Sequence, residues 1–132
     1  MGVPLDTIKK NIKYAIGLEK LEVICRVPVI PKFNYTLNDA KKICELLLEL
    51  GATKVELLPY HNYGESKYKL LNIPYEYEDV EQLHKDDKGF VEYKKVFENY
   101  GFNVRWSIFL KFKILQLKSN ILTIEILEVY CK

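Results

Sequence analysis

Two apolar runs on either side of an amphipathic segment constrain the fold of this chain more than any other feature. The runs are residues 21–30 and 54–60, and both have the nearly continuous apolarity of strands buried in a parallel sheet. Between them, residues 37–50 carry apolar side chains at helical spacing, and Gly51 stands where helices commonly end. A strand–helix–strand order with short connections predicts parallel strands joined by a right-handed crossover.

The same alternation continues on both sides of this unit. A helix is expected upstream, with Asp6 as its N-cap and its end near Gly17. Downstream, aromatic residues at helical spacing predict a helix over residues 89–100, followed by a third strand over residues 102–106. The chain of 132 residues is therefore expected to form one α/β domain in which parallel strands alternate with helices.

Two residues break the apolar pattern of the first strand. Arg26 places a charge in the middle of the run, and an isolated buried charge is costly unless it is paired or holds an anion. One interpretation is a guanidinium fork that grips a carboxylate or ribose hydroxyls. The other is a salt bridge to Glu22 or Glu56, or a side chain that reaches the sheet edge. Pro28 cannot donate a ladder hydrogen bond, so the strand is expected to be distorted or at an edge from there on.

A histidine follows the end of the second strand. Pro59 and Tyr60 close the apolar run, and His61 comes next, at the carboxyl end where ligands bind in parallel α/β folds. Its ring is expected either to contact a ligand or to be tied into the loop by backbone hydrogen bonds. The other histidine, His84, has charged neighbours and is interpreted as a surface residue. Two histidines so far apart do not indicate a histidine-based metal site.

Residues 61–87 are expected to form a long, packed loop and not a helix, because Gly64 and Pro74 interrupt a segment dense in tyrosine. Gly64 would allow a turn that brings Lys67 and Tyr68 back over the strand end. The alternative is a surface lysine and a packing tyrosine. No nucleophile–histidine–acid set and no glycine-rich phosphate loop is present, so no catalytic residue is predicted.

The composition bears on which classes of protein this chain can belong to. A net charge of +2 gives no electrostatic argument for nucleic acid, and no apolar run approaches the ~20 residues of a membrane span. The first ten residues have no apolar signal core. The three cysteines, Cys25, Cys44 and Cys131, are too far apart in sequence for a local metal or redox motif. They are expected to be free thiols in a reducing cytoplasm, with Cys25 and Cys44 as ordinary core residues.

The last segment, residues 105–132, differs in character from the rest. It has no glycine and no proline, and apolar residues alternate with lysines over residues 110–114. Ser119 and Asn120 offer a turn, after which residues 121–130 are expected to return as a strand. The interpretation is a β-prone tail that forms a β-hairpin or packs as an amphipathic segment.

Two blocks of sequence resemble a known family. RVPVIPKFN (residues 26–34) and VELLPYHNYGESKY (residues 55–68) are similar to the C-terminal half of the glycyl radical enzyme activating enzymes, radical S-adenosylmethionine proteins of the pyruvate formate-lyase activating enzyme type. The family has R-x-P-x-I-P-G-x-N and, about 20–25 residues on, L-L-P-Y-H-x-x-G-x-x-K-Y. The opening GVPLDTIKKNIKYA and the later FENYGFNV are similar to helices and a strand of the same half. The resemblance covers about residues 2–104.

The resemblance implies a fold and a chemistry. Residues 1–104 would be the C-terminal part of a partial (β/α) barrel, with residues 105–132 as a tail foreign to the family. The family binds S-adenosylmethionine and a four-iron–four-sulfur cluster, cleaves the former reductively, and generates a glycyl radical on a partner enzyme. The residues that match its S-adenosylmethionine ligands are Arg26 and His61.

The chain also departs from the family pattern. The cluster motif C-x-x-x-C-x-x-C is absent, none of the three cysteines replaces it by spacing, and Lys32 stands where the family usually has glycine. The hypothesis is therefore a truncated activating enzyme that performs no radical chemistry alone, with a glycyl radical enzyme or a missing N-terminal half as its partner. The alternative is a non-catalytic α/β binding or interaction module, in which the tail covers an exposed sheet edge.

Overall fold

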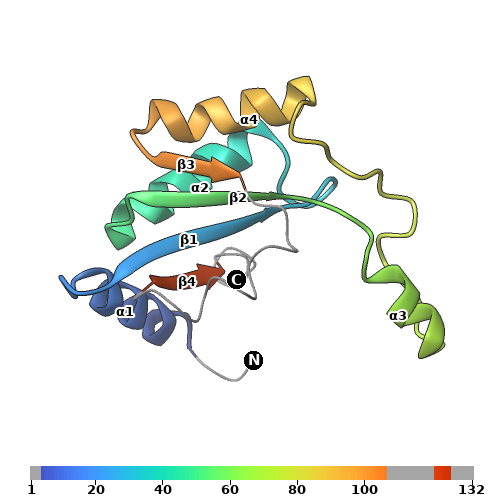
Figure 1. The fold of residues 1–132 in the computed structure, drawn as a ribbon, viewed down its shortest axis with the longest axis horizontal. Coiled ribbons are helices and arrows are strands. Elements are labelled where there is room, and N and C mark those ends of the chain that lie inside the picture. The colour runs from blue at the N-terminus through green and yellow to red at the C-terminus, as the bar shows by residue number, and fades with distance from the viewer. Residues whose placement is uncertain (1–3, 107–120, 126–132) are drawn as a thin grey trace.

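The computed structural model describes residues 4–106 and 121–125 (Figure 1). Helices and strands alternate along the chain as expected, with one additional short helix and a strand from the tail. The elements are α1 (Leu5–Ile16), β1 (Glu22–Val29), α2 (Leu37–Leu50), β2 (Lys54–Pro59), α3 (Glu65–Leu70), α4 (Lys88–Asn99), β3 (Asn103–Trp106) and β4 (Ile121–Glu125).

The described strands form one parallel sheet in the order β3–β2–β1–β4. The first three strands lie side by side in chain order, which is the arrangement that right-handed crossovers predict. β4 adds to the free side of β1, so the last described strand of the chain neighbours the first (Figure 1). The expected α/β class with parallel strands is confirmed.

The two faces of the sheet differ. Alternate residues of β1 and β2 enter one apolar core together with Ile12 of α1 and with side chains of α2 and α4. The strand members of this core are Cys25, Val27, Val29, Val55 and Leu57. The intervening positions face the other way, and they include the buried residues Ile24, Arg26, Glu56 and Leu58. The charged residues of the strands are therefore directed away from the helix-covered core.

The observed ends of the helices agree in part with those predicted from the sequence. α2 begins with a capping box, in which Thr36 Oγ1 accepts from the Asp39 N–H at 3.1 Å and Asp39 Oδ2 accepts from the Thr36 N–H at 3.2 Å. Gly51 ends this helix in the left-handed conformation, with φ of 83°. The prediction that Asp6 caps α1 is wrong. The helix begins after Pro4, whose carbonyl accepts from the N–H of Thr7, and Asp6 lies in the first turn.

Pro28 lies near the carboxyl end of β1, where β2 pairs with it. β2 continues beside it, with Pro28 opposite Leu58 and Val29 opposite Pro59. In contrast, the described pairing between β1 and β4 ends at Arg26 and Glu125. β1 remains a strand to Val29, and the expectation of an edge from Pro28 onward stays a prediction because residues 126–132 lie outside the described residues.

The segment after β2 departs from its prediction. Residues 65–70 form the short helix α3, where a loop without helix was expected. Gly64 does not interrupt the segment because it adopts an ordinary right-handed conformation, with φ of −78°, and directly precedes the helix. α3 stands apart from the sheet, beyond the carboxyl end of β2 (Figure 1).

The tail contributes a strand within the range expected for one. Residues 121–125 pair in parallel with β1. The other arm of the expected hairpin falls on residues 107–120, which lie outside the described residues. The predicted division of the chain into residues 1–104 and a tail of residues 105–132 stays a prediction.

Lys32 adopts a conformation that suits glycine. Its φ is 64°, in the left-handed region, which costs a residue with a Cβ about 1–2 kcal/mol. We expect Lys32→Gly to raise the free energy of unfolding by about 0.5–1 kcal/mol, because the relief of strain exceeds the entropy cost of an added glycine. Urea unfolding measures this change. Lys32→Ala is the control: it retains a Cβ and should give no gain, and an equal gain from both variants would contradict the explanation.

Candidate functional site

A buried ion pair joins the middle of β1 to β2. Arg26 Nε donates to Glu56 Oε2 at 2.9 Å, and the two residues are 8% and 4% exposed. The pair follows from the strand register, which places Arg26 beside Glu56 on the face opposite the helices. The salt-bridge interpretation of Arg26, with Glu56 as its partner, is therefore correct. The second candidate acid, Glu22, is paired with Lys54 at 2.7 Å.

Charged residues alternate in sign along one row across the sheet. β3 places Arg105 beside Glu56, and β4 places Glu125 at the register position beside Arg26. Arg105 also contributes, after the contact with Lys54, to a pKa of Glu22 below its ordinary value. On this face of the sheet, β1 and β2 are joined by two ion pairs, Arg26 with Glu56 and Glu22 with Lys54.

Asn34 fixes the chain where it leaves β1. Its side-chain oxygen accepts from the Ile30 N–H at 2.7 Å, and its amide donates to the Pro28 carbonyl at 2.8 Å. The residue is 1% exposed, so this pair of hydrogen bonds is inside the protein. The side chain supplies backbone partners just after a proline, which has no N–H of its own. Asn34 is the last residue of the block at residues 26–34, and no sequence pattern predicted its hydrogen bonds.

His61 lies just past the carboxyl end of β2, as expected. Its Nδ1 accepts weakly from the Tyr63 N–H at 3.4 Å, and its ring lies 4.2 Å from the Tyr63 ring, centroid to centroid. Burial lowers the pKa of His61 below its ordinary value. The ring is therefore neutral at pH 7, with its Nδ1 turned toward the backbone of its own loop. This geometry agrees with the interpretation in which the loop holds the ring.

Arg26 lies in the carboxyl half of β1, and His61 lies two residues past the end of β2. Glu56, the partner of Arg26, is followed by three further positions of β2 before the strand ends at Pro59. At about 3.3 Å per residue, roughly 10 Å of strand separates the ion pair from the strand end.

Tyrosines pack around the start of the loop. Tyr60 and Tyr75 share a hydrogen bond of 2.8 Å between their hydroxyl groups, and burial together with this bond raises the pKa of Tyr60. The Tyr68 ring lies 4.9 Å from the Tyr75 ring. Tyr68 thus reaches the strand end through Tyr75, and Lys67 is exposed on α3. Lys67 is thus a surface lysine, as in the second interpretation, and Tyr68 contacts Tyr75 while 42% of its surface is exposed.

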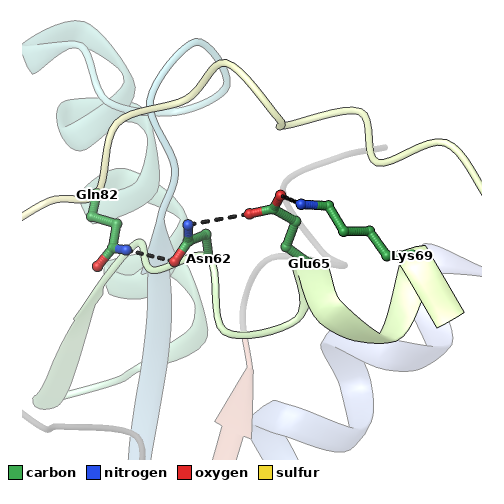
Figure 2. A network of polar contacts seen from close by, with 4 residues as sticks. All are labelled: Asn62, Glu65, Lys69 and Gln82. Atoms are coloured by element: carbon green, nitrogen blue, oxygen red, sulfur yellow. Dashed lines mark hydrogen bonds and ion pairs between the residues drawn. The ribbon is translucent and has the colours of Figure 1, made fainter.

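A polar network links the loop to α3. Asn62 Oδ1 accepts from the Gln82 side-chain amide, and Asn62 Nδ2 donates to Glu65 Oε2 at 3.3 Å (Figure 2). Glu65 in turn contacts Lys69 Nζ at 2.6 Å. Next to this network is an open hollow of about 600 Å³, lined by Asn62, Val80, Glu81, Gln82, His84 and Asp87. His84 is exposed there, as predicted.

The described cysteines are poor metal ligands. Cys25 and Cys44 are fully buried free thiols, and both belong to the helix-covered core, as predicted. Burial raises the pKa of Cys25 to about 11 and that of Cys44 to about 12, which disfavours the thiolate that binds metals. Within residues 4–106 and 121–125, no group of three or more histidine, cysteine or acidic side chains is arranged to hold a metal ion.

The lowered pKa of His61 predicts a pH dependence of stability. The unfolded chain binds a proton at His61 near pH 6.5, while the folded protein binds it only at lower pH. Stability should therefore fall as the pH decreases from about 6.5 toward the lower folded pKa. His61→Gln should remove this contribution, as measured by thermal melting between pH 5 and 7.5. A variant with an unchanged pH profile would contradict the assignment.

No helix in the described part of the chain has the length and apolar character needed to cross a membrane.

The comparisons with known proteins give one consistent result. No family model matches the chain. It is 32% identical to the pyruvate formate-lyase 2-activating enzyme of Escherichia coli K12 over 58% of its length. It is 33% identical to the trans-4-hydroxy-L-proline dehydratase activating enzyme of Clostridioides difficile over 79% of its length, and 37% identical to the (2S)-3-sulfopropanediol sulfolyase activating enzyme of Bilophila wadsworthia over 69%.

These matches cover a minor part of each relative. The chain spans 26% of the first relative, 34% of the second and 29% of the third. All three are activating enzymes by name, as the two motif blocks predicted. The chain is therefore a partial relative of the glycyl radical enzyme activating enzymes.

Proposed function

We propose that this chain is the C-terminal portion of a glycyl radical enzyme activating enzyme and supplies one side of an S-adenosylmethionine site. The main support is the sequence similarity to three activating enzymes, together with the positions of Arg26 in the carboxyl half of β1 and of His61 just past the end of the adjacent parallel strand β2. That edge of a parallel sheet is where ligands bind in barrels of this class.

The order of the strands and the side on which the helices pack also support this proposal. β1, β2 and β3 follow one another without a reversal of direction, and their helix-facing side is one continuous core. Strands wound in this way curve into a barrel when more of them are added, with the opposite face inside. We infer that Arg26 and Glu56 lie on the inner wall of a partial (β/α) barrel.

S-adenosylmethionine fits the two residues chemically. It carries a carboxylate, ribose hydroxyls and an adenine ring. A guanidinium is a planar group with five N–H donors, the geometry that suits a carboxylate or ribose hydroxyls, and the bond from Arg26 to Glu56 uses the donor on Nε. His61 is an aromatic ring just past the end of β2, and an imidazole is a group that can stack on an adenine ring. When bound, the cofactor would supply the sulfonium group that the family cleaves.

An iron–sulfur cluster does not fit this chain. The described thiols are buried in the core with raised pKa values, and the sequence has no C-x-x-x-C-x-x-C segment. We therefore propose that radical chemistry requires a cluster held by another polypeptide, either a separate N-terminal half or an intact activating enzyme. The final acceptor of the radical would be a glycyl radical enzyme. The unpaired thiols suit the reducing cytoplasm.

The proposed inactivity is tested by anaerobic cluster reconstitution. The purified chain is incubated with iron, sulfide and a reductant, and 5′-deoxyadenosine is measured after addition of S-adenosylmethionine. We expect no product above a sample without protein. Turnover by this polypeptide alone would refute the proposal.

The proposed site is tested by calorimetry with S-adenosylmethionine. We expect weak binding, and His61→Ala and Arg26→Ala should each reduce the affinity by about tenfold, equivalent to ~1.4 kcal/mol. Because Arg26→Ala also disturbs the ion pair, Arg26→Lys, which keeps the charge, is measured alongside it. His84→Ala is the matched histidine control and should bind normally. Unchanged binding in the His61 and Arg26 variants would show that the site is elsewhere.

A second candidate function is a self-contained interaction module, and β4 favours it. This strand covers the side of β1 that would otherwise be an open sheet edge. Gel filtration with thermal melting distinguishes the two: a monomer that melts cooperatively supports the module, whereas aggregation supports a fragment that needs its other part.

A further inference from the structure

The residues on both sides of His61 are fastened to one short segment further along the chain. The Tyr60 carbonyl accepts from the Leu83 N–H at 2.9 Å. Asn62 Oδ1 accepts from the side-chain amide of Gln82 (Figure 2). Gln82 and Leu83 are neighbours in sequence, so they hold the residue before His61 and the residue after it. These four residues, Tyr60, Asn62, Gln82 and Leu83, form a clasp around His61.

The clasp is joined to the rest of the fold at both of its ends. Tyr60 continues the pairing of β1 with β2, because its N–H donates to the Val29 carbonyl at 3.1 Å. Leu83 packs against the apolar core. A turn follows at once, in which Asp87 Oδ2 accepts from the His84 N–H at 2.7 Å, and Asp87 directly precedes α4. The clasp is therefore held by the sheet on one side and by the core and the start of α4 on the other.

A carboxylate sets the direction of the hydrogen bonds in the clasp. Glu65 accepts from Asn62 Nδ2 at 3.3 Å and forms an ion pair with Lys69 Nζ at 2.6 Å (Figure 2). A carboxylate only accepts, so the amide nitrogen of Asn62 is turned toward Glu65 and its oxygen toward Gln82. Gln82 must then be the donor. A side chain at position 82 that cannot donate would break the bond to Asn62.

We propose that Gln82 is a positioning residue, which acts through Asn62 to hold His61 at the carboxyl end of β2 for contact with a ligand. The ligand is S-adenosylmethionine, so this inference rests on the function proposed above. Gln82 acts through the loop and not by a contact of its own. A ring whose backbone is already fixed loses less freedom when a ligand binds, and a site organised in advance binds more tightly.

The test reverses the direction of the hydrogen bonds in the full chain. Gln82→Glu keeps the size of this exposed side chain but replaces its donor by an acceptor, which leaves Asn62 between two carboxylates. Glu65→Gln added to it supplies a donor on the other side. The amide of Asn62 then turns over, and both hydrogen bonds form again in the opposite direction. Glu65→Gln alone keeps an acceptor for Asn62 and is the control.

Two measurements report on His61 without any ligand. In Gln82→Glu, amide exchange over residues 60–63 should become at least about threefold faster, because one of the bonds that close the clasp is lost. In an NMR titration, the pKa of His61 should move up toward its ordinary value as the ring loses burial. The double variant should reverse both changes, and Glu65→Gln alone should cause neither. A pKa that stays raised in the double variant would reflect the introduced charge and contradict the positioning role.

Calorimetry with S-adenosylmethionine shows whether the position of His61 matters for the ligand. Gln82→Glu should weaken binding at least about threefold, and the double variant should restore it. Unchanged exchange over residues 60–63 in Gln82→Glu, or full affinity despite faster exchange, would overturn the proposal. If the unaltered chain does not bind S-adenosylmethionine, the proposed function fails, whereas exchange and titration still decide whether Gln82 positions His61.

Discussion

Replacing Glu56 with alanine is expected to lower the free energy of unfolding by about 3–5 kcal/mol, because the Arg26 guanidinium would lose its carboxylate inside the sheet. The pair is joined at 2.9 Å and both residues are buried, so water does not take the place of the missing carboxylate. Such a loss is a large share of the ~5–15 kcal/mol that stabilises a typical domain. Urea unfolding followed by the fluorescence of the single tryptophan measures it.

The neighbouring ion pair is the control. Glu22 and Lys54 join the same two strands at 2.7 Å, but about a third of each side chain is exposed to solvent. Glu22→Ala should therefore cost less than about 1 kcal/mol. Combined replacement of both buried charges, Arg26→Met with Glu56→Leu, should restore most of the stability lost in Glu56→Ala. Equal losses for Glu22→Ala and Glu56→Ala would show that burial does not decide the effect.

The second large effect is expected at Phe97, in the aromatic core beneath α4. Its side chain is fully buried, with ring centroids 5.5 Å from Tyr93 and 6.3 Å from Phe102. Phe97→Ala removes this packing and leaves a cavity, at a cost of about 3–5 kcal/mol. The measurement is again the midpoint and slope of urea unfolding.

An exposed aromatic residue on another helix tests the specificity of this loss. Tyr14 lies on α1 with 72% of its surface exposed. Tyr14→Ala should change the stability by no more than about 0.5 kcal/mol, because it removes little buried area and alanine favours a helix. If the two substitutions cost the same, the core assigned to α4 would be wrong.

The sequence predicted the buried charge but not which partner it takes. Glu22 and Glu56 both lie in apolar strands near Arg26, and neither pattern nor spacing distinguishes them. The choice follows from the register between β1 and β2, which sets Ile24 beside Lys54 and Arg26 beside Glu56. This register is a product of the crossover through α2 and of core packing, and these are interactions of the folded chain as a whole.

Two further differences between prediction and structure also arise because a local sequence pattern does not contain the interactions of the folded chain. The periodicity of the tail predicted a strand within residues 121–130, but a local pattern gives no information on which distant strand it will join. α3 was not predicted, because a helix of six residues has little periodicity and because Gly64 was expected to interrupt a helix. In contrast, α2 and the strands around it were predicted well, because their apolar patterns and helix ends agree with the final packing.

The placement of β4 has a consequence for synthesis on the ribosome. β1 is translated before β4, because Ile121 lies 99 positions after its partner Glu22. At about 5–20 residues per second, translation of the intervening chain takes on the order of 5–20 seconds. During this interval the nascent chain lacks the segment that completes the sheet. Folding during synthesis therefore begins with this side of β1 unpaired with β4, and the β1–β4 ladder is added only after β4 has emerged.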